Sequence, residues 1–488
     1  MRNSSRREYS KSNSPVMQSM VEQEDDGEEA EYGDDEIFVG WKLGDKNLYR
    51  ELEDEAVRTE GGHNTQAIQF ALREFQREAG NREDTLSLDQ SSAGIELVVG
   101  KRGSGKTFFE RARSNREAEG GVLNVLVDRK HEYYSNNLYN GIQEDNKNLG
   151  KGEEKQTIDT TVLLPYFVKK RINKQEGVSL PGREYTETFK FNFSDLDPNM
   201  LSYIFLYDVK ENSSRYKDFE KYTRKLRKRM EDGEIQSFNH CKQLAEEMQE
   251  REQFNYRQGR GRAGEIKDKL EKYEDWGFLG NDMDLYSNEV METEELDGIG
   301  LEKLVQETNT IAISFGDEME NLPDNLQMPQ LYIAILIKKL RDLKKSGKLD
   351  KKVKLCIDEA HEFLDEEDPS NQRDAPPAHW QIRQVIKVDR GKGFRVSLAT
   401  QEIQDLPEKN CLKAVDHAFI PQNIDSDGRR YLLDLYDVHG GSLDTGNKKW
   451  QKIFDVFDQY QWLYIDVDQK YWSLLEVASP LAYHKEED

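Results

Sequence analysis

The sequence predicts an α/β fold with a mainly parallel sheet, and two observations lead to that prediction. From residue 94 onward, short apolar segments typical of strands alternate with longer segments typical of helices. A glycine-rich segment, Gly100–Thr107, also joins one of these strands directly to a helix. A parallel sheet accounts for both patterns, because the crossover between two parallel strands is usually a helix.

The expected elements follow one another along the chain in this alternating pattern. Strand Ile95–Gly100 leads through the glycine-rich turn into a helix over Phe109–Glu119, which stops at Gly120 and Gly121. A second helix is expected over Gln330–Lys345, closed by Ser346 and Gly347. The other expected strands are Val122–Val127, Thr161–Leu164, Thr188–Phe193, Thr310–Phe315, Val353–Ile357, Arg395–Ala399, His417–Ile420, Trp462–Val467 and Tyr471–Leu475.

Three regions are expected. Residues 1–36 form a tail rich in acidic residues, which we expect to be disordered because it has too little apolar surface to bury. Such a tail either keeps the protein soluble or serves as an interaction arm. Residues 37–90 form a small segment of unknown fold, with an apolar start at Ile37–Val39 and a helix around Thr65–Glu78. Residues 91–488 form the α/β domain, with a charged helical insertion at about 198–300.

The composition excludes several classes of protein. Acidic residues outnumber basic ones by 95 to 70 in 488 residues, so the net charge is −25 and a basic coat around nucleic acid is ruled out, although a local basic face is not. The three cysteines are Cys241, Cys356 and Cys411, with no C-x-x-C among them, so neither a disulfide framework nor a structural zinc site is predicted. The apolar stretches, such as Leu331–Ile337, are too short to cross a bilayer. We therefore expect a soluble cytoplasmic protein without membrane insertion.

A phosphate-binding loop is predicted where the first strand of the α/β domain ends. The segment that fits G-x-x-x-x-G-K-[ST], together with the next residue, is Gly100, Lys101, Arg102, Gly103, Ser104, Gly105, Lys106, Thr107 and Phe108. The glycines allow several backbone N–H groups to point at phosphate oxygens, and the helix N-terminus adds its positive end. Lys106 would reach the β- and γ-phosphates of ATP, and the Thr107 hydroxyl would bind Mg²⁺. The alternative is a glycine-rich turn that binds no ligand.

Two further strands end in residues that suit nucleotide hydrolysis. Strand Val353–Ile357 is followed by Asp358, which would hold Mg²⁺ through water, and by Glu359, which would polarise the attacking water. The alternative is a solvated strand end in an acidic chain. Strand Arg395–Ala399 is followed by Thr400 and Gln401, and a polar side chain at this place can sense hydrolysis of the γ-phosphate.

Five stretches in this order resemble the HerA/FtsK group of DNA-pumping ATPases, in particular archaeal HerA and the conjugation and virus-packaging ATPases. Besides the phosphate-binding loop, the resembling stretches are Leu126–Tyr133 with Asp128, Thr310–Ser314, Leu355–Leu364 with Asp358 and Glu359, and Arg390-x-x-Gly393 followed by Leu398–Gln401. The resemblance covers roughly residues 95–480.

The resemblance implies a RecA-like domain that hydrolyses ATP with Mg²⁺ and moves double-stranded DNA through a ring-shaped homo-oligomer, a hexamer. It implies that Asp128 takes part in cofactor binding and that Arg390 acts across the subunit boundary, the alternative being a surface basic residue. A nuclease, a capsid component or a secretion apparatus would be the protein partner, and the location would be the cytoplasm or, for a viral protein, the virion. Two features depart from the family: residues 37–90 show no β-barrel pattern, and Asp84–Leu97 contains no arginine.

Two other functions fit parts of the sequence. A P-loop switch or scaffold would bind ATP in order to assemble, but it would not need Glu359. A DEAH helicase would explain Asp358-Glu359-Ala360-His361, but it needs a second RecA-like domain after that motif, and only about 125 residues follow.

Two basic segments are candidates for DNA contact, Arg224–Arg229 and Arg257–Arg262. The alternative for both is a solvated helix face or salt bridges to nearby acidic residues.

Overall fold

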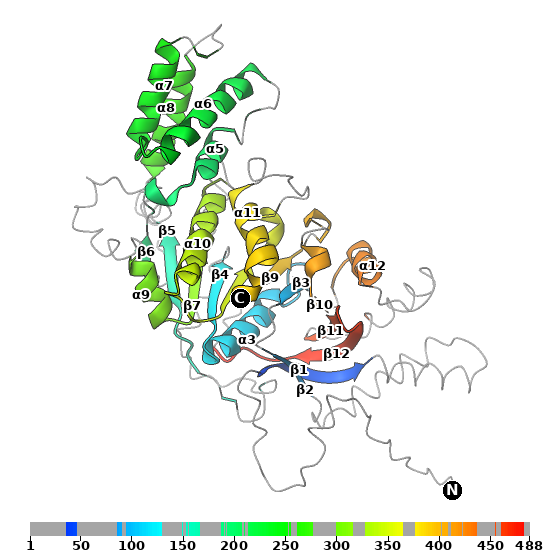
Figure 1. The fold of residues 1–488 in the computed structure, drawn as a ribbon. Helices are drawn as coiled ribbons and strands as arrows, with labels where there is room; N and C mark the ends of the chain where they lie inside the picture. The colour runs from blue at the N-terminus through cyan, green and yellow to red at the C-terminus, as the bar shows by residue number, and fades with distance from the viewer. Residues whose placement is uncertain are drawn as a thin grey trace, which may run out of the picture.

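The fold is that of a computed structural model (Figure 1). It describes residues 36–45, 85–89, 94–128, 149–165, 187–254, 261–276, 299–315, 327–364, 376–436 and 454–482, with gaps at 150–152, 155, 190, 192, 207–208, 210–212, 252, 402, 408–410, 422 and 455–459. The expected acidic tail, apart from Glu36, and the helix expected around Thr65–Glu78 lie outside the described residues.

The described strands form one twelve-stranded sheet in the order β2-β1-β12-β11-β10-β3-β9-β8-β4-β7-β5-β6. Their bounds are β1 Glu36–Asp45, β2 Thr85–Asp89, β3 Ile95–Val99, β4 Leu123–Asp128, β5 Thr161–Pro165, β6 Glu187–Phe189, β7 Thr310–Ser314, β8 Val353–Ile357, β9 Phe394–Thr400, β10 His417–Pro421, β11 Gln461–Asp466 and β12 Tyr471–Val477. The predicted strands are therefore present with small shifts at their ends. The largest shift is at Thr188–Phe193, where β6 ends at Phe189 and a 3₁₀ helix covers Phe193–Asp195.

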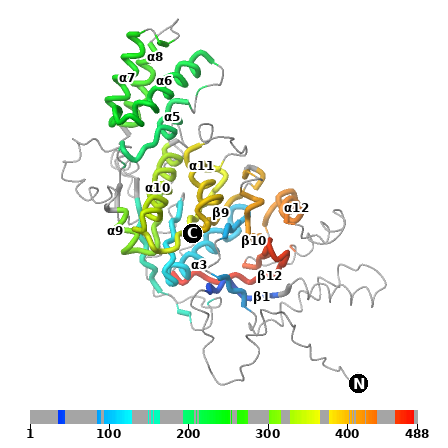
Figure 2. Tube along the Cα trace, viewed as in Figure 1, coloured from blue at the N-terminus to red at the C-terminus, as the bar shows by residue number. Residues whose placement is uncertain are grey.

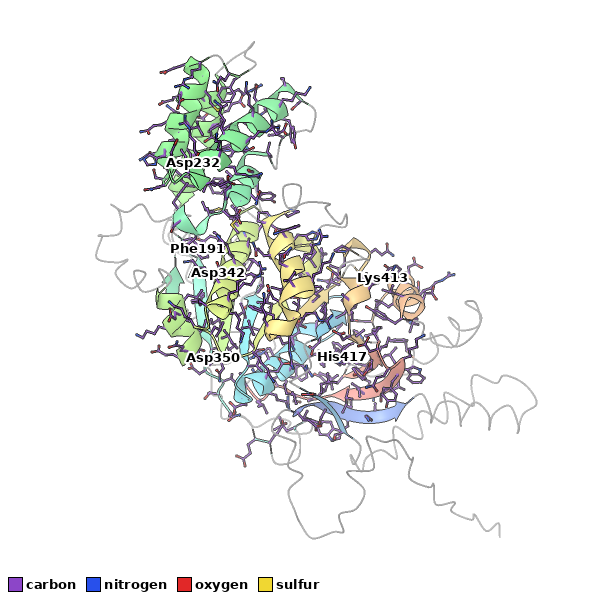
Figure 3. All side chains as sticks on the ribbon, viewed as in Figure 1. Phe191, Asp232, Asp342, Asp350, Lys413 and His417 are labelled. Carbon is purple, nitrogen blue, oxygen red and sulfur yellow. The ribbon has the colours of Figure 1, made fainter. Side chains whose placement is uncertain are left out.

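The eight strands from β10 to β6 in this order are parallel, which confirms the predicted fold class. Strand β9 lies between β3 and β8, pairing Val396 with Ile95 and Phe394 with Val353. Because the strands are parallel, the residues that follow β3, β4, β8 and β9 lie at one edge of the sheet, which we call the carboxyl edge. In Figure 3 the opposite, amino edge is marked by Asp350, which precedes β8, and by His417 at the start of β10.

An antiparallel part extends the sheet beyond β10. Strand β11 pairs with β10 and β12, β12 pairs with β1, and β1 pairs with β2. The described parts of residues 37–90, which we expected to form a segment of their own, are thus two strands of the main sheet. Sequence patterns could not show this, because the partner strand β12 lies more than 400 residues away along the chain.

Helices cover both faces of the parallel strands. The helix bounds are α3 Lys106–Glu119, α5 Pro198–Leu206, α6 Ser214–Glu231, α7 Phe238–Glu250, α8 Arg262–Trp276, α9 Ile299–Glu307, α10 Gln327–Lys345, α11 Pro377–Gln384 and α12 Ser426–Leu435. Side chains of α10 and α11, such as Leu331 and Ile382, share one apolar cluster with Ile95 and Leu97 of β3. Phe109 of α3 clusters instead with Val98, which points to the opposite face because side chains alternate along a strand. We call these the α10 face and the α3 face.

Helix α3 is enclosed from both sides. The sheet covers one side, and β1 and β12 run beside the helix in Figure 1, together with the segment that follows β12. The Arg116 guanidinium lies 5.4 Å from the centre of the Phe38 ring and donates to the Ser479 carbonyl at 2.8 Å. The backbone N–H of Ala482 donates to the Asn115 side chain at 3.0 Å. As a result, even the charged residues of α3 between positions 110 and 117 are buried.

The helical insertion forms a lobe that stands away from the sheet, built from α5, α6, α7 and α8 (Figure 2). Its own apolar side chains, including Phe219, Tyr222 and Leu244, are buried. Ser213 and Ser237 cap α6 and α7 by accepting backbone N–H groups of the first turns. In Figure 3 the lobe, marked by Asp232, lies on the side of the sheet away from Asp350 and His417.

Among the described residues, we find no helix that has both the length and the hydrophobicity needed to cross a membrane.

Candidate active site

The phosphate-binding loop lies at the carboxyl edge, between β3 and α3. Gly103 and Gly105 have φ angles of 78° and 85°, a region that favours glycine because other residues clash there. Gly100 must be small for another reason: a Cβ atom there would lie 2.5 Å from Ser104 Oγ and 2.6 Å from Pro421 Cγ. The loop pattern of glycines therefore follows from the backbone that the loop adopts.

Hydrogen bonds connect Lys106 to the loop backbone, and the loop backbone to β9. Lys106 is buried, and its Nζ donates to the Gly100 carbonyl at 2.7 Å. The N–H of Gly100 donates in turn to the Thr400 carbonyl at 3.1 Å, and the N–H of Ser104 donates to the Lys101 carbonyl at 3.1 Å. Thr107 and Phe108 are half-buried in the first turn of α3. Lys101 and Arg102 are exposed at the tip of the loop, where they can meet a charged ligand.

The two acidic residues after β8 are buried at the same edge. Asp358 is 6% exposed and Glu359 is 3% exposed. The Asp358 Oδ1 atom accepts the backbone N–H of Glu359 at 2.9 Å. Glu359 has φ 48° and ψ 51°, a left-handed conformation that is uncommon for a residue other than glycine. Strained residues of this kind cluster at functional sites, and they persist only where the surrounding structure holds them in place.

The Glu359 carboxylate contacts Gln401, the residue that follows β9. Its Oε1 atom accepts a hydrogen bond from Gln401 Nε2. Its Oε2 atom is buried, lies 3.6 Å from His361 Nδ1, and has no hydrogen-bond partner among the described residues. His361 Nδ1 is also 3.1 Å from Thr400 Oγ1. The structure therefore brings Glu359 and Gln401, predicted from separate motifs, into contact.

Asp128 lies beside these residues. It ends β4 and is 2% exposed, and the register that pairs Val127 with Ile357 places it next to Asp358. Among the described residues, no cluster of three or more His, Cys, Asp or Glu side chains could hold a metal ion alone. Mg²⁺ that arrives with a nucleotide needs no such cluster, because phosphate oxygens and water fill most of its positions. The oxygen donors Thr107 and Asp358 at one edge fit that ion.

Arg390 lies at the other end of the sheet. It precedes β9, and its Nη2 atom contacts both carboxylate oxygens of Asp416, at 2.9 and 2.7 Å. Asp416 precedes β10 and also accepts the backbone N–H of Ile95 at 2.7 Å. The seven residues of β9 span about 20 Å. Within one chain, Arg390 is therefore not brought to Lys106 and Glu359.

Glu110 is a buried group near the loop that the sequence analysis missed. It lies one helical turn after Lys106, is 3% exposed, and accepts from Ser397 Oγ at 3.3 Å. Burial, and next the negative charge of Asp358, raise the pKa of Glu110 to about 8, against the opposing charges of Lys354 and Lys106. The only sequence signal for Glu110 is that it lies four residues after Lys106. In a chain with 95 acidic residues, an acidic residue often has this position by chance.

A buried ionic network lies deeper on the α3 face. Lys354 Nζ of β8 is 2.7 Å from Glu96 of β3 and 2.8 Å from Glu117 of α3. Arg113 of α3 contacts Glu96 and lies 3.1 Å from Glu117. Burial alone would raise the pKa of Glu96, but the charges of Arg113 and Lys354 outweigh it and lower the pKa to about 2. The network thus joins the helix after the loop to the strand that ends in Asp358.

The order of the strands decides the type of fold. The loop strand β3 and the acidic strand β8 are separated by β9, whose end supplies Thr400 and Gln401. The chain has a RecA-like P-loop NTPase fold. All strands of the described residues belong to its one sheet, so they provide no second RecA-like domain of the kind that a DEAH helicase needs.

Comparisons with known proteins find a likeness in structure. No family and no curated protein matches the sequence. VirB4 of Thermoanaerobacter pseudethanolicus is 12% identical with a TM-score of 0.49, over 81% of this chain and 94% of that one. The plasmid coupling protein TrwB, in complex with GDPNP, is 11% identical with a TM-score of 0.44, over 82% of this chain and 88% of that one. The genome packaging NTPase B204 of Sulfolobus turreted icosahedral virus 2, in complex with ATP-gammaS, is 11% identical with a TM-score of 0.31, over 79% of this chain and 97% of that one.

TrwB, a conjugative coupling protein, and B204, a genome packaging NTPase, are of the classes that the five sequence stretches resemble. At such identities and TM-scores no function follows from the likeness, and the function of this RecA-like chain has to be argued from its own residues.

Proposed function

We propose that the chain is an ATPase that moves double-stranded DNA as a ring-shaped homo-oligomer, a hexamer. The observation that carries the hydrolytic part of this proposal is the Glu359 carboxylate. It is buried at the carboxyl edge with the phosphate-binding loop, Gln401 holds one of its oxygens, and the other has no hydrogen-bond partner among the described residues. A carboxylate with one oxygen held and one available is suited to orient and polarise a water molecule.

The residues of the site divide the chemistry between them. The loop N–H groups and Lys106 bind the triphosphate and offset its charge, and Asp128 lies beside the acidic pair. Thr107 and Asp358 would hold Mg²⁺, which supplies further charge neutralisation at the phosphates. Glu359 accepts the proton of the attacking water, and Gln401 fixes the orientation of Glu359 and senses the change when the γ-phosphate leaves. Arg390 would serve the site of a neighbouring subunit, since it lies far from the site of its own chain.

A P-loop switch or scaffold is the alternative, and Glu359 separates the two. Glu359→Gln should keep ATP binding and lower turnover by about 10²–10⁴-fold, because an amide does not accept the proton. Lys106→Ala should weaken ATP binding itself. Steady-state ATPase and equilibrium ATP binding would be measured on both variants, with Glu362→Gln as the control that makes the same chemical change three residues away. Hydrolysis by the Glu359→Gln variant at the rate of that control would remove the catalytic role and favour the switch.

The basic residues of the two candidate segments differ in whether they are exposed or engaged in contacts within the lobe. In the segment Arg224–Arg229, Arg227 donates to Asn199 at 2.6 Å and Arg229 lies 2.8 Å from Glu247, so both are engaged within the lobe. In Arg257–Arg262, Arg262 lies 2.6 Å from Glu265, and residues 257–260 lie outside the described part of the chain. The exposed basic residues of α6 are Lys217, Lys221, Arg224 and Lys228. Their spacing of three or four places them along one face of the helix.

The DNA contact is tested on this α6 face. The double variant Arg224→Gln, Lys228→Gln should lower the stimulation of ATPase by double-stranded DNA, leave the basal rate unchanged, and flatten the salt dependence of DNA binding by about one unit per lost phosphate contact. Lys303→Gln on α9 is the control for an exposed lysine outside the lobe. Equal stimulation and an equal salt slope in all three proteins would place the DNA contacts outside α6.

The proposed function also implies protein partners and a location for the motor. A nuclease, a capsid component or a secretion apparatus would be the partner of such a motor, in the cytoplasm or in a virion. The resemblance of the motifs to conjugation and packaging ATPases supports these settings equally.

A further inference from the structure

Two aromatic side chains lie together beside the phosphate-binding loop, one from each end of the domain sequence. Phe108 follows Thr107 in the first turn of α3, and Tyr460 immediately precedes β11. Their ring centroids are 5.1 Å apart and the rings are tilted by 43°. Both side chains are half-buried, so each leaves part of its surface uncovered beside the loop. Aromatic side chains dominate the energetics of interfaces as well as of cores, so a pair of rings that keeps exposed surface is a candidate for ligand contact.

The place of Tyr460 at this edge follows from the strand register. Strand β11 runs antiparallel to β10 and pairs Trp462 with Pro421, the last residue of β10. The start of β11 therefore lies at the carboxyl edge, where Gly100 already approaches Pro421. The N–H of Val477 donates to the Tyr460 carbonyl at 2.9 Å, which fixes the backbone that carries the ring.

A buried layer of aromatic rings supports the pair. The Phe109 ring stacks on Trp462 at 4.9 Å and 27°, and it packs against Phe419 at 4.5 Å. A Cβ atom on Gly105 would lie 3.7 Å from Cζ2 of Trp462, so the indole lies directly against the turn of the loop. Because this layer is fully buried, the half-exposed pair next to it rests on a fixed base.

Two buried polar atoms at the same place have no hydrogen-bond partner within the described residues. They are Ser104 Oγ of the loop and Nε1 of Trp462, whose side chain is 1% exposed. Buried donors without partners are uncommon, because leaving one unsatisfied costs free energy. That both occur where the loop meets the aromatic layer marks this spot as a place for a ligand with polar groups.

We propose that Phe108 and Tyr460 form the platform that binds the base of the nucleotide, and that the base is a purine. The inference rests on the proposed nucleotide binding and adds the residues that select the base. Stacking uses the face of a base and leaves its polar edge unread, so ATP and GTP should bind about equally. A purine covers more of the two rings than a pyrimidine, so CTP should bind more weakly.

The test compares nucleotides with inorganic tripolyphosphate, which has the phosphates but no base. Dissociation constants for ATP, GTP, CTP and tripolyphosphate would be measured with Mg²⁺ on the full chain and on Tyr460→Ala. The variant should bind ATP and GTP about 5- to 100-fold more weakly, the range for loss of one base–aromatic stack. Its affinity for tripolyphosphate should stay that of the unaltered chain. Tyr460→Phe keeps the ring and should bind all four ligands normally.

Two control variants make the result specific. Tyr471→Ala removes a half-buried tyrosine from the same antiparallel strands at the amino edge, and it should leave every affinity unchanged. Phe108→Leu keeps apolar volume but removes the second ring, and it should lower the affinity for ATP and GTP as Tyr460→Ala does. This variant also carries the test if Tyr460→Ala does not fold.

Each failure has a distinct meaning. If Tyr460→Ala and Phe108→Leu bind ATP as tightly as the unaltered chain, or lose affinity for tripolyphosphate to the same extent as for ATP, the platform is refuted while nucleotide binding stands. If the unaltered chain binds neither ATP nor tripolyphosphate, the proposed function itself fails. CTP bound as tightly as ATP would refute the preference for a purine.

Discussion

The two faces of the parallel strands are built from different chemistry. On the α10 face, Ile95, Leu97 and Val99 of β3 lie in one apolar cluster with the α10 helix. On the α3 face, Glu96 of the same strand joins Lys354, Arg113 and Glu117 in a buried ionic network. The alternation along β8 is the same, with Val353, Leu355 and Ile357 on the apolar side and Lys354 and Asp358 on the other.

The apolar α10 face stabilises the fold, whereas the ionic network on the α3 face connects the elements that carry the site residues. Apolar contacts have no direction, so the α10 face favours compactness without fixing one exact arrangement. Buried ion pairs are stable only in good geometry, because each charge must recover the hydration it lost. The network therefore fixes α3, which begins at Lys106, relative to β8, which ends at Asp358. We expect substitutions on the two faces to differ in how they can be rescued and in how they respond to pH.

The largest effect is expected from Lys354→Met. The change leaves Arg113 as the one cation among the described residues that contacts the two buried carboxylates of Glu96 and Glu117, and it should lower the free energy of unfolding by about 3–5 kcal/mol. Adding Glu117→Gln should recover part of this loss, because it removes the negative charge that Arg113 alone does not balance. Denaturant unfolding at pH 7 would measure both variants, with exposed Lys345→Met as the control. A single variant as stable as that control would show that the network does not hold α3 to β8.

A somewhat smaller effect is expected from Leu355→Ala, the next residue on the same strand but on the α10 face. Removing this buried side chain should lower the free energy of unfolding by about 2–4 kcal/mol through lost apolar burial and the cavity left behind. The loss should be equal at pH 5 and pH 8, since no titrating group is involved. Adding Glu117→Gln to this variant should recover nothing. A recovery as large as in the Lys354→Met background would mean that the two faces are not independent.

A third effect, which appears only as pH rises, is expected from Glu110→Gln. The pKa of Glu110 is about 8 in the folded chain, against 4.5 for an ordinary glutamate. Between these values the unfolded chain releases this proton while the folded chain keeps it, so Glu110 lowers stability progressively as pH rises from 4.5 to 8. The glutamine variant should be close to the unaltered chain in stability at pH 5 and become progressively more stable than it as pH rises to 8. Equal stability differences at the two pH values would contradict the raised pKa.

The parts of the fold that the sequence predicted are those with local signals. Apolar runs next to glycines marked β3 and β4, an apolar run before an acidic pair marked β8, and the change from charged helix to strand marked β7. The pairing of β1 with β12 had no such signal, because it depends on contacts between residues far apart in the chain. Strand order likewise depends on which crossovers pack, which a single sequence does not reveal.

The site divides in the same way. Lys106, Asp358 and Gln401 were expected together because each follows a strand, and parallel strands bring such residues to one edge. Arg390 was placed from its motif alone, and the motif did not show that it precedes β9 and so lies at the opposite edge. Tyr460 was missed because nothing in its surrounding sequence distinguishes it from the many other tyrosines of the chain. The roles of all these residues in catalysis remain predictions.

The enclosure of α3 has a consequence for how the chain is synthesised. The outer cover of this helix includes Ser479 and Ala482, and β1 gains its partner β12 only with residues 471–477. While the ribosome is still adding these residues, β1 and β2 can form only a two-stranded ribbon, which is barely stable alone. For most of translation, the charged outer side of the nascent α3 is therefore uncovered, and one edge of β1 is unpaired. A chaperone that binds unpaired strand edges could therefore bind this edge from the synthesis of β1 and β2 onward, and its release would coincide with the synthesis of β12.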